Sequence, residues 1–416
     1  MNILKLIGGI LFLAIASLTV APAPTRLLWT ASLAATEWGY WLAALAILPL
    51  LPTPGTTRIG KLGGLLSAAA IALFVFPVVQ ARQMNGELPA EFNARFGSDL
   101  RARSREAEYA RTQPLELTDL LRGPSVPAVR FEERVFANPE GQTLRLDVYR
   151  PAYEHAPLPG LIVVHGGTWQ DGDNGDFLKL NAYLASRDFV VASINYRLAP
   201  EWKFPAPRDD VFAAIAHMKV HGQEFGLDGS RLAILGREAG GQLALLAAYT
   251  SGEPAIKGAI SLYGPTDLQF GYEHPAPRMI VDSRARLETF LGGPPAKAAD
   301  AYVAASPINF VGPATPPTLL IHGMRDSVVS PDESARLERK LQDSGVKHMF
   351  VRLKWATHGC DRSFGGPCGQ VATYAIERFL DAVLAAPPPP DPKSKTKPKA
   401  PARGAAPRNV SAAARR

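Results

Sequence analysis

The sequence is poor in cysteine and histidine, and its main part carries no excess of basic charge. Its eight histidines form no cluster with its two cysteines or with carboxylates at the spacing of a metal site, so we expect no metal ion and no cofactor. The net charge of +7 comes from residues 387–416, which hold eight Lys or Arg and one Asp. The rest of the chain is neutral overall, so we expect no nucleic-acid partner.

Long apolar runs are confined to the start of the chain. Residues 6–20, 27–51 (interrupted by Glu37) and 62–79 are each near the length of about 20 residues that spans a bilayer as a helix. They predict a transmembrane anchor of about three helices over residues 1–82. The first run is alternatively a signal peptide, because small residues follow it at 21–23.

The flanking charges predict the orientation of this anchor. Lys5 precedes the first run, and Arg58 and Lys61 lie between the second and the third. By the positive-inside rule these residues stay in the cytoplasm, so the rest of the chain lies outside it, in the periplasm or the extracellular space.

Two further segments flank the main domain. Residues 83–125 predict a helical stalk or partial lid, in which Phe92, Phe96 and Leu100 share one helix face; a solvated spacer is the favoured interpretation. Residues 386–416 are rich in Pro, Lys and Ala, and such a basic tail buries too little apolar surface to fold. The main domain is therefore expected at 126–385.

Within residues 126–385, strand-like and helix-like segments alternate. Helical patterns occur at 177–187, 210–219, 239–248, 331–343 and 369–383. Short apolar or β-branched runs occur at 144–149, 161–164, 190–194, 232–235, 256–263, 318–321 and 348–353. This alternation is typical of an α/β domain with a mostly parallel sheet and helices on both faces.

Several motifs lie where these predicted strands end. They are His165-Gly166-Gly167, the run Asn-Tyr-Arg-Leu-Ala-Pro at 195–200, Gly236-x-x-x-Gly240-Gly241, Tyr-Gly-Pro at 263–265 and His322-Gly323-x-x-Asp326. In this order they resemble the hormone-sensitive-lipase and feruloyl-esterase-like branch of the α/β hydrolases, which are carboxylesterases. The resemblance covers residues 126–384 and implies the α/β-hydrolase fold and a small-molecule ester or ester-like ligand.

The resemblance also implies roles for single residues. Residue 238, between Gly236 and Gly240, occupies the position of the nucleophile, His358 is the general base, and Asp326 orients its ring. His165 is a structural residue of its loop. The backbone N–H groups expected to form an oxyanion hole are those of Gly166, Gly167 and Ala239. The side chains expected either to line a substrate pocket or to be ordinary packing are Trp169, Tyr196 and Trp355.

The nucleophile position departs from the family pattern. It holds Glu238, and the chain contains no Gly-x-Ser-x-Gly. An ionised carboxylate has no proton for His358 to remove, which closes the ordinary acyl-enzyme route. Three hypotheses follow: a membrane-anchored carboxylesterase-type protein impaired by this replacement, a pseudohydrolase that binds a ligand or partner, or a hydrolase that uses Glu238 as nucleophile or base.

The length of the glutamate side chain suggests what Glu238 does. Its carboxyl carbon lies two bonds beyond Cβ, as the acyl carbon of an acylated serine does. We therefore expect one carboxylate oxygen near the N–H groups of Gly166, Gly167 and Ala239, and the other facing His358.

The two cysteines flank residues 361–367, just after His358. In an oxidising compartment, Cys360 and Cys368 are expected to form a disulfide that steadies the histidine loop; in the cytosol they would remain thiols.

Overall fold

A computed structural model describes residues 1–97, 111–153 and 157–385. Its central element is an eight-stranded sheet in the order β1-β2-β4-β3-β5-β6-β7-β8. The first two pairings are antiparallel and the rest are parallel, so the mostly parallel sheet predicted from the sequence is confirmed. The strands are β1 Val129–Ala137, β2 Leu144–Pro151, β3 Leu158–Val164, β4 Val190–Ile194, β5 Leu227–Arg237, β6 Ile256–Leu262, β7 Thr318–Gly323 and β8 His348–Leu353.

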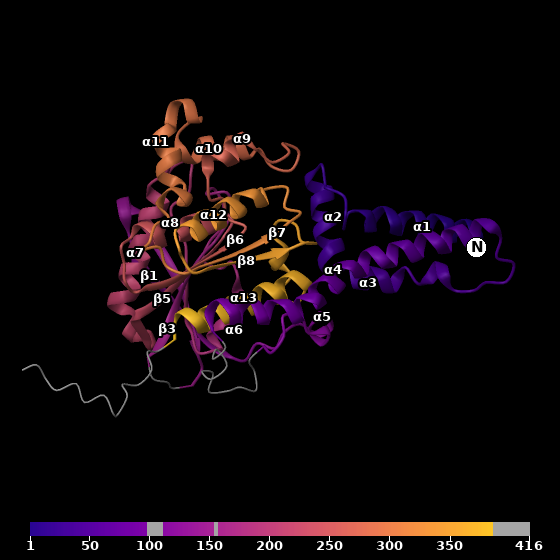
Figure 1. Ribbon diagram of the computed structural model, residues 1–416, viewed down its shortest axis with the longest axis horizontal. Helices are drawn as coiled ribbons and strands as arrows, with labels where there is room; N and C mark the ends of the chain where they lie inside the picture. Colours follow the sequence, from indigo (N-terminus) through magenta and orange to yellow (C-terminus); the bar gives the residue numbers. More distant parts are fainter. Residues whose placement is uncertain (98–110, 154–156, 386–416) are drawn as a thin grey trace, which may run out of the picture. The chain divides into compact units, whose positions relative to one another are not determined.

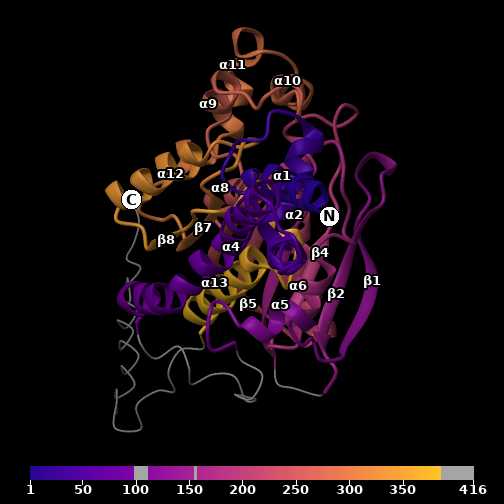
Figure 2. The ribbon, with the colours of Figure 1, turned by 90° about the vertical axis from the view of Figure 1, so that its right-hand side faces the viewer.

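Helices cover both faces of the sheet because its central strands are apolar on both sides. On β3, Leu161 and Val163 pack toward one core, which includes α6 and α13, and Ile162 and Val164 pack toward the other, which includes α7, α8 and α12. Figure 2 shows α8 and α12 on the side of the sheet opposite α13. These helices are α6 Leu178–Ala185, α7 Ala206–His221, α8 Ala239–Thr250, α12 Pro331–Asp343 and α13 Pro367–Val383.

Between β6 and β7 the chain adds three helices that no sequence pattern had predicted. They are α9 Leu268–Glu273, α10 Ser283–Leu291 and α11 Pro295–Ala305. Their buried residues, such as Leu268, Phe290 and Tyr302, join the core that includes α8. They form a layer beyond that face of the sheet (Figure 1). The short helix α5 Leu117–Arg122 precedes β1, and 3-10 turns lie at η2 Pro139–Gly141, η3 Gly222–Phe225, η4 Pro307–Phe310 and η5 Cys360–Arg362.

The N-terminal region consists of α1 Asn2–Ser17, α2 Arg26–Glu37, α3 Gly39–Leu45, the 3-10 turn η1 Leu48–Leu50 and α4 Arg58–Phe96. α1 lies alongside α4 (Figure 1), and Gly9 meets Gly63 so closely that a Cβ on Gly9 would lie 2.3 Å from the Gly63 carbonyl oxygen. Of the helices in the described residues, only α4 is long and apolar enough by itself to cross a membrane.

Within the run 27–51 the chain bends by 80° between Arg26–Glu37 and Gly39–Leu50. One expectation for this region is corrected. The segment after the third apolar run is not a solvated spacer, because α4 continues to Phe96 and buries Phe92 against Tyr374 of α13. Leu100 and the tail 386–416 lie outside the described residues. The helices and the sheet together form one compact unit, Met1–Leu384.

Candidate active site

Glu238 occupies a sharp turn between β5 and α8. Its φ of 51° and ψ of −119° are rarely adopted by a residue other than glycine, and its N–H donates to the Leu262 carbonyl at 2.9 Å. A Cβ on Gly236 would lie 1.9 Å from the Gly240 carbonyl oxygen, and one on Gly240 would lie 2.2 Å from that of His165. The two glycines are therefore required for the turn to close, and the turn has the strained form of a nucleophile elbow.

The carboxylate of Glu238 is held by backbone N–H groups of the loop that follows β3. Gly167 N–H donates to Oε2 at 2.6 Å, and Thr168 N–H lies 3.0 Å from Oε2 and 3.1 Å from Oε1. Gly167, Thr168 and Trp169 all have positive φ, at 105°, 52° and 58°. Successive N–H groups in a tight turn of this kind form an anion-binding concavity.

This geometry corrects the expected set of donors. Gly167 donates as expected, but its companion is Thr168, and no hydrogen bond from Gly166 or Ala239 to the carboxylate is found within the described residues. Gly166 contributes by having no side chain, because a Cβ there would lie 2.9 Å from Oε2. Thr168 was not among the donors expected from the sequence.

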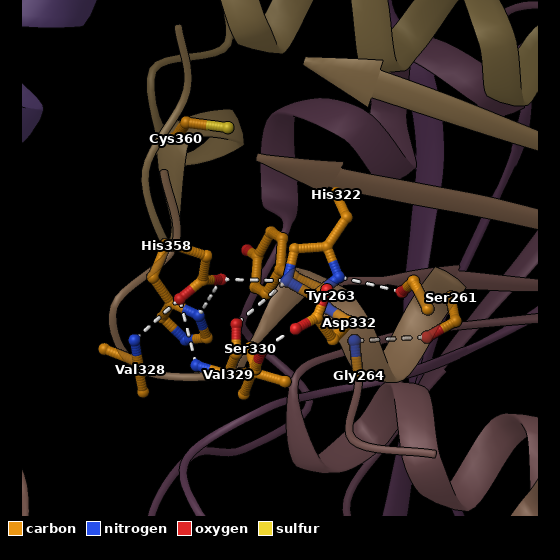
Figure 3. Close-up of polar contacts among 12 residues, drawn as sticks. Ser261, Tyr263, Gly264, His322, Val328, Val329, Ser330, Asp332, His358 and Cys360 are labelled. Carbon is orange, nitrogen blue, oxygen red and sulfur yellow. Dashed lines mark hydrogen bonds and ion pairs between the residues drawn. The ribbon is translucent and has the colours of Figure 1, made fainter. Parts of the chain in front are cut away.

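His358 and Asp326 meet at the ends of β8 and β7. The imidazole Nδ1 lies 2.7 Å from Oδ2 of Asp326, whose side chain is fully buried. The other oxygen of Asp326, Oδ1, accepts from the N–H groups of Val328 and Val329 at 2.8 and 2.9 Å (Figure 3). Because Nδ1 faces Asp326, Nε2 is the nitrogen left to act on a reacting group, the arrangement of a histidine and its orienting acid.

His322 supports Asp326. It belongs to a motif found in the sequence, but the sequence indicated no role for it. Its Nε2 faces two acceptors, the Val329 carbonyl at 3.1 Å and Oδ2 of Asp326 at 3.3 Å. Nε2 must therefore carry the proton, and Nδ1 accepts from the Ser334 hydroxyl at 2.8 Å (Figure 3). The carboxylate of Asp326 is thus fixed from three sides.

The charges of the site are coupled. Burial alone would lower the pKa of His358, but the charge of Asp326, its hydrogen bond and the charge of Glu238 raise it overall. Burial alone would raise the pKa of Asp326, but the charge of His358 and the hydrogen bonds from His322 and His358 hold it well below its ordinary value. The described residues contain no hydrogen bond between Glu238 and His358, so Glu238 acts on the imidazole through its charge.

A buried ion pair lies next to the elbow. Arg237, the residue before Glu238, donates through Nε to Asp361 at 2.8 Å, and the Tyr263 hydroxyl donates to the other oxygen of Asp361 at 2.5 Å. The Tyr263 ring in turn lies 4.6 Å from that of His358, centroid to centroid. This network ties the elbow to the loop that carries the histidine, and nothing in the sequence pattern had indicated it.

That loop is closed by a disulfide between Cys360 and Cys368, whose Cα atoms are 5.7 Å apart. We expect no free thiol in unreduced protein from the native host, as measured by thiol titration under denaturing conditions. Replacing both cysteines by serine is expected to lower the free energy of unfolding by about 2–3 kcal/mol, the value typical of so short a loop. Two titratable thiols would show that the bond does not form there, and would also weaken the case for an extracytoplasmic domain.

A small pocket of about 50 Å³ opens beside Glu238. Its apolar wall includes Leu268, Val281, Leu287 and Val329, and Thr168 and Trp169 border it. Of the three aromatic candidates, only Trp169 lines this pocket.

The other two aromatic candidates are packing residues. Tyr196 stacks on His165 with centroids 4.2 Å apart and donates to the His165 carbonyl at 3.2 Å. Trp355 is buried in the core next to β8. Trp29 of α2, in contrast, lies with its ring centroid 6.4 Å from that of His358, and no sequence motif had pointed to it.

Several known proteins similar to this chain are esterases. The BD-FAE family model matches residues 146–341. The esterase LipC of Mycobacterium tuberculosis is 32% identical over 57% of this chain and 62% of its own length, and the probable carboxylic ester hydrolase LipM of the same organism is 30% identical over 59% of each chain. The chain thus spans about three fifths of these curated relatives.

Solved structures show the same fold. An esterase from Pyrobaculum calidifontis is 24% identical, with a TM-score of 0.55 over 74% of this chain and 94% of that one. A bacterial heroin esterase is 20% identical, with a TM-score of 0.55 over 73% and 92%. The family match and the order of motifs along the chain place a domain of the hormone-sensitive-lipase and feruloyl-esterase-like type at residues 146–341, and its homologues are carboxylesterases of the α/β-hydrolase superfamily.

Proposed function

We propose that this chain is a membrane-anchored α/β hydrolase of the carboxylesterase type in which Glu238 occupies the oxyanion hole, so that the chain binds ester-like small molecules but hydrolyses them at near background rates. One observation carries this proposal: the N–H groups of Gly167 and Thr168 donate to the Glu238 carboxylate. These are the donors that a reacting ester needs for the oxygen on which negative charge develops.

The contacts of Glu238 explain why turnover would be slow. A substrate carbonyl has to displace an ionised carboxylate from charge-assisted hydrogen bonds, and a neutral oxygen replaces such bonds poorly. Glu238 also has no hydroxyl that His358 can activate. The side chain therefore resembles an acyl-enzyme that cannot be hydrolysed, while Asp326 and His358 keep the arrangement of an active site.

The N-terminal helices support a membrane anchor, residues 1–82. α4 has the length and composition of a span, and large apolar side chains of α1 and α4 are exposed, among them Leu4, Leu11 and Leu65. The glycine contact between α1 and α4 is of the kind that packs helices in membranes, and it favours α1 as part of the anchor over a signal peptide. Lys5 donates to the Leu51 carbonyl, and Arg58 lies at the start of α4. Both basic residues lie at the end of the helical region that is far from the sheet (Figure 1). This supports a hydrolase domain, 126–385, outside the cytoplasm.

The segment between anchor and hydrolase domain, residues 83–125, is proposed to act as a partial lid and brace. Asn85 of α4 accepts from Leu115 N–H at 2.7 Å, and Gln370 of α13 accepts from Glu116 N–H at 2.9 Å. For the basic tail 386–416, which lies outside the described residues, the proposal remains that it is dispensable for folding.

A rival hypothesis keeps catalysis, with Glu238 attacking the ester carbon or acting as a base on water. Attack would expel the alcohol and form a mixed anhydride, and water that attacks this anhydride at the Glu238 carbon would release the substrate acid and leave the water oxygen in the Glu238 carboxylate. Both oxygens of Glu238 already accept N–H hydrogen bonds from Gly167 and Thr168, so these donors are not available to the carbonyl oxygen of the substrate. We therefore rank this hypothesis below the first.

An assay in ¹⁸O-labelled water separates these hypotheses. We expect the chain to hydrolyse a short-chain aryl ester at the rate of its His358→Ala variant, and mass spectrometry of the peptide with Glu238 to show no ¹⁸O in the side chain. A rate well above that variant would contradict the proposal. In that case, ¹⁸O in Glu238 would identify it as a nucleophile, and its absence would favour a base.

A further inference from the structure

Helix α2 follows the rim of the candidate active site along its whole length. At its start, Arg26 N–H donates to the Met279 carbonyl at 3.0 Å, in the loop before α10. One turn later, Trp29 faces the His358 ring. At its end, Glu37 accepts from Cys368 N–H at 3.1 Å, at the disulfide that closes the histidine loop. The helix therefore contacts the loop before α10, the histidine loop and the start of α13, at the end of the sheet where Glu238 and His358 lie.

The outer side of α2 and the adjoining loop is apolar and exposed. Leu27 is 79% exposed, Leu28 is 36% exposed, and Met279, bonded to the start of α2, is 70% exposed. Val281, two residues beyond Met279, lines the pocket beside Glu238. The loop that carries the exposed Met279 therefore also supplies part of the apolar pocket wall. We call the surface formed by Leu27, Leu28 and Met279 the rim patch.

The rim patch continues into the apolar helices of the N-terminal region. α2 packs on them through Ala35, which lies in one cluster with Ala16 of α1 and with Ala70 and Phe74 of α4. The chain bends by 80° after α2, so the axis of α2 is nearly perpendicular to that of the segment Gly39–Leu50. A helix set across spanning helices, with apolar residues on its outer side, lies along the bilayer surface. Figure 1 shows α2 where α1 and α4 reach the sheet domain.

We propose that the rim patch lies in the lipid surface and that the pocket beside Glu238 takes the acyl chain of an ester dissolved in the bilayer. The apolar wall of Leu268, Val281, Leu287 and Val329 suits such a chain, with its ester group next to Glu238 and His358. Arg26, which is exposed at the start of α2, is then at the depth of anionic headgroups. The identity of the ligand as an ester rests on the function proposed above, whereas the placement of the rim patch does not.

Spin labels test the placement in the full chain. Single variants Leu27→Cys and Met279→Cys are spin-labelled in vesicles of phosphatidylcholine with phosphatidylglycerol. The label reacts only with the introduced cysteine, because the two native cysteines are joined in a disulfide. Val220→Cys is the matched control, because Val220 is 73% exposed and lies at the end of α7, which leads to the start of β5, whereas Glu238 follows the end of β5. We expect the labels at 27 and 279 to collide more with oxygen than with a nickel chelate, and the control to show the reverse. Labels at 27 and 279 that behave like the control would overturn the proposal.

Turnover tests the substrate class, in the Glu238→Ser background. Leu27→Asp with Met279→Asp is expected to lower hydrolysis of a long-chain aryl ester in vesicles at least about tenfold, because charge is disfavoured in lipid, and to leave a short soluble ester unaffected. Val220→Asp is expected to change neither rate. An equal loss on both esters, or on neither, would overturn the bilayer route. If the serine parent hydrolyses no ester at all, the function proposed above fails, and the spin labels still decide the placement.

Discussion

Glu238→Ser is expected to raise the rate of hydrolysis of a short-chain aryl ester at least about 10³-fold, since loss of a nucleophile lowers turnover by several orders of magnitude in serine hydrolases. The variant supplies the hydroxyl that His358 needs, and it releases the N–H groups of Gly167 and Thr168 for the substrate oxygen. The turn itself is set by Gly236 and Gly240, so serine at position 238 has the same backbone to occupy. The measurement is kcat/KM for the two purified chains side by side.

His358→Ala in the serine background is the control for this comparison, and it should return the rate to that of the unmodified chain. A serine variant that is folded but no faster would show that the pocket has changed beyond one residue. The pseudohydrolase hypothesis, in which the site only binds a ligand or partner, would then be preferred.

Asp326→Asn in the Glu238→Ser background is expected to lower kcat by about 10³- to 10⁴-fold, with a much smaller change in KM, because an amide no longer fixes the tautomer of His358 or stabilises its charged form. The substitution changes the hydrogen bond between Oδ2 of Asp326 and Nδ1 of His358, which are 2.7 Å apart. Because Asp326 is charged and buried in the folded chain, the variant's thermal melting has to be measured with its kinetics.

Asp332→Asn is the matched control, since Asp332 is an exposed aspartate on the first turn of α12, six positions further along the chain. It should leave kcat within about twofold, as is usual for surface substitutions. An Asp326→Asn chain that folds and keeps most of its activity would show that Asp326 is a structural residue of the turn after β7.

The sequence predicted the sheet domain well because its strands are short apolar runs between turn residues. The run 348–353 and β8 coincide, and the helix predicted at 331–343 is α12. The positions of Glu238, Asp326 and His358 at the ends of β5, β7 and β8 followed from motif order, since the ends of parallel strands meet at one edge of a sheet.

What the sequence did not reveal depends on contacts between distant parts of the chain. Trp29 lies in an apolar run that reads as a membrane span, and only the 80° bend after α2 places it near His358. The donor role of Thr168 belongs to its backbone, whose φ of 52° no pattern encodes. Helices α9 to α11 are short, and they are stabilised by packing on the sheet domain rather than by strong helical periodicity.

The most direct test of the central claim, that the Glu238 carboxylate fills the oxyanion hole, is an NMR comparison of the unmodified chain with Glu238→Gln. The two residues have the same shape and differ in charge. In the unmodified chain we expect the Gly167 amide proton to resonate further downfield, because it donates to the Glu238 carboxylate. We also expect a higher pKa for His358, because the negative charge of Glu238 raises it. The same amide shift and the same His358 pKa in both chains would contradict the claim.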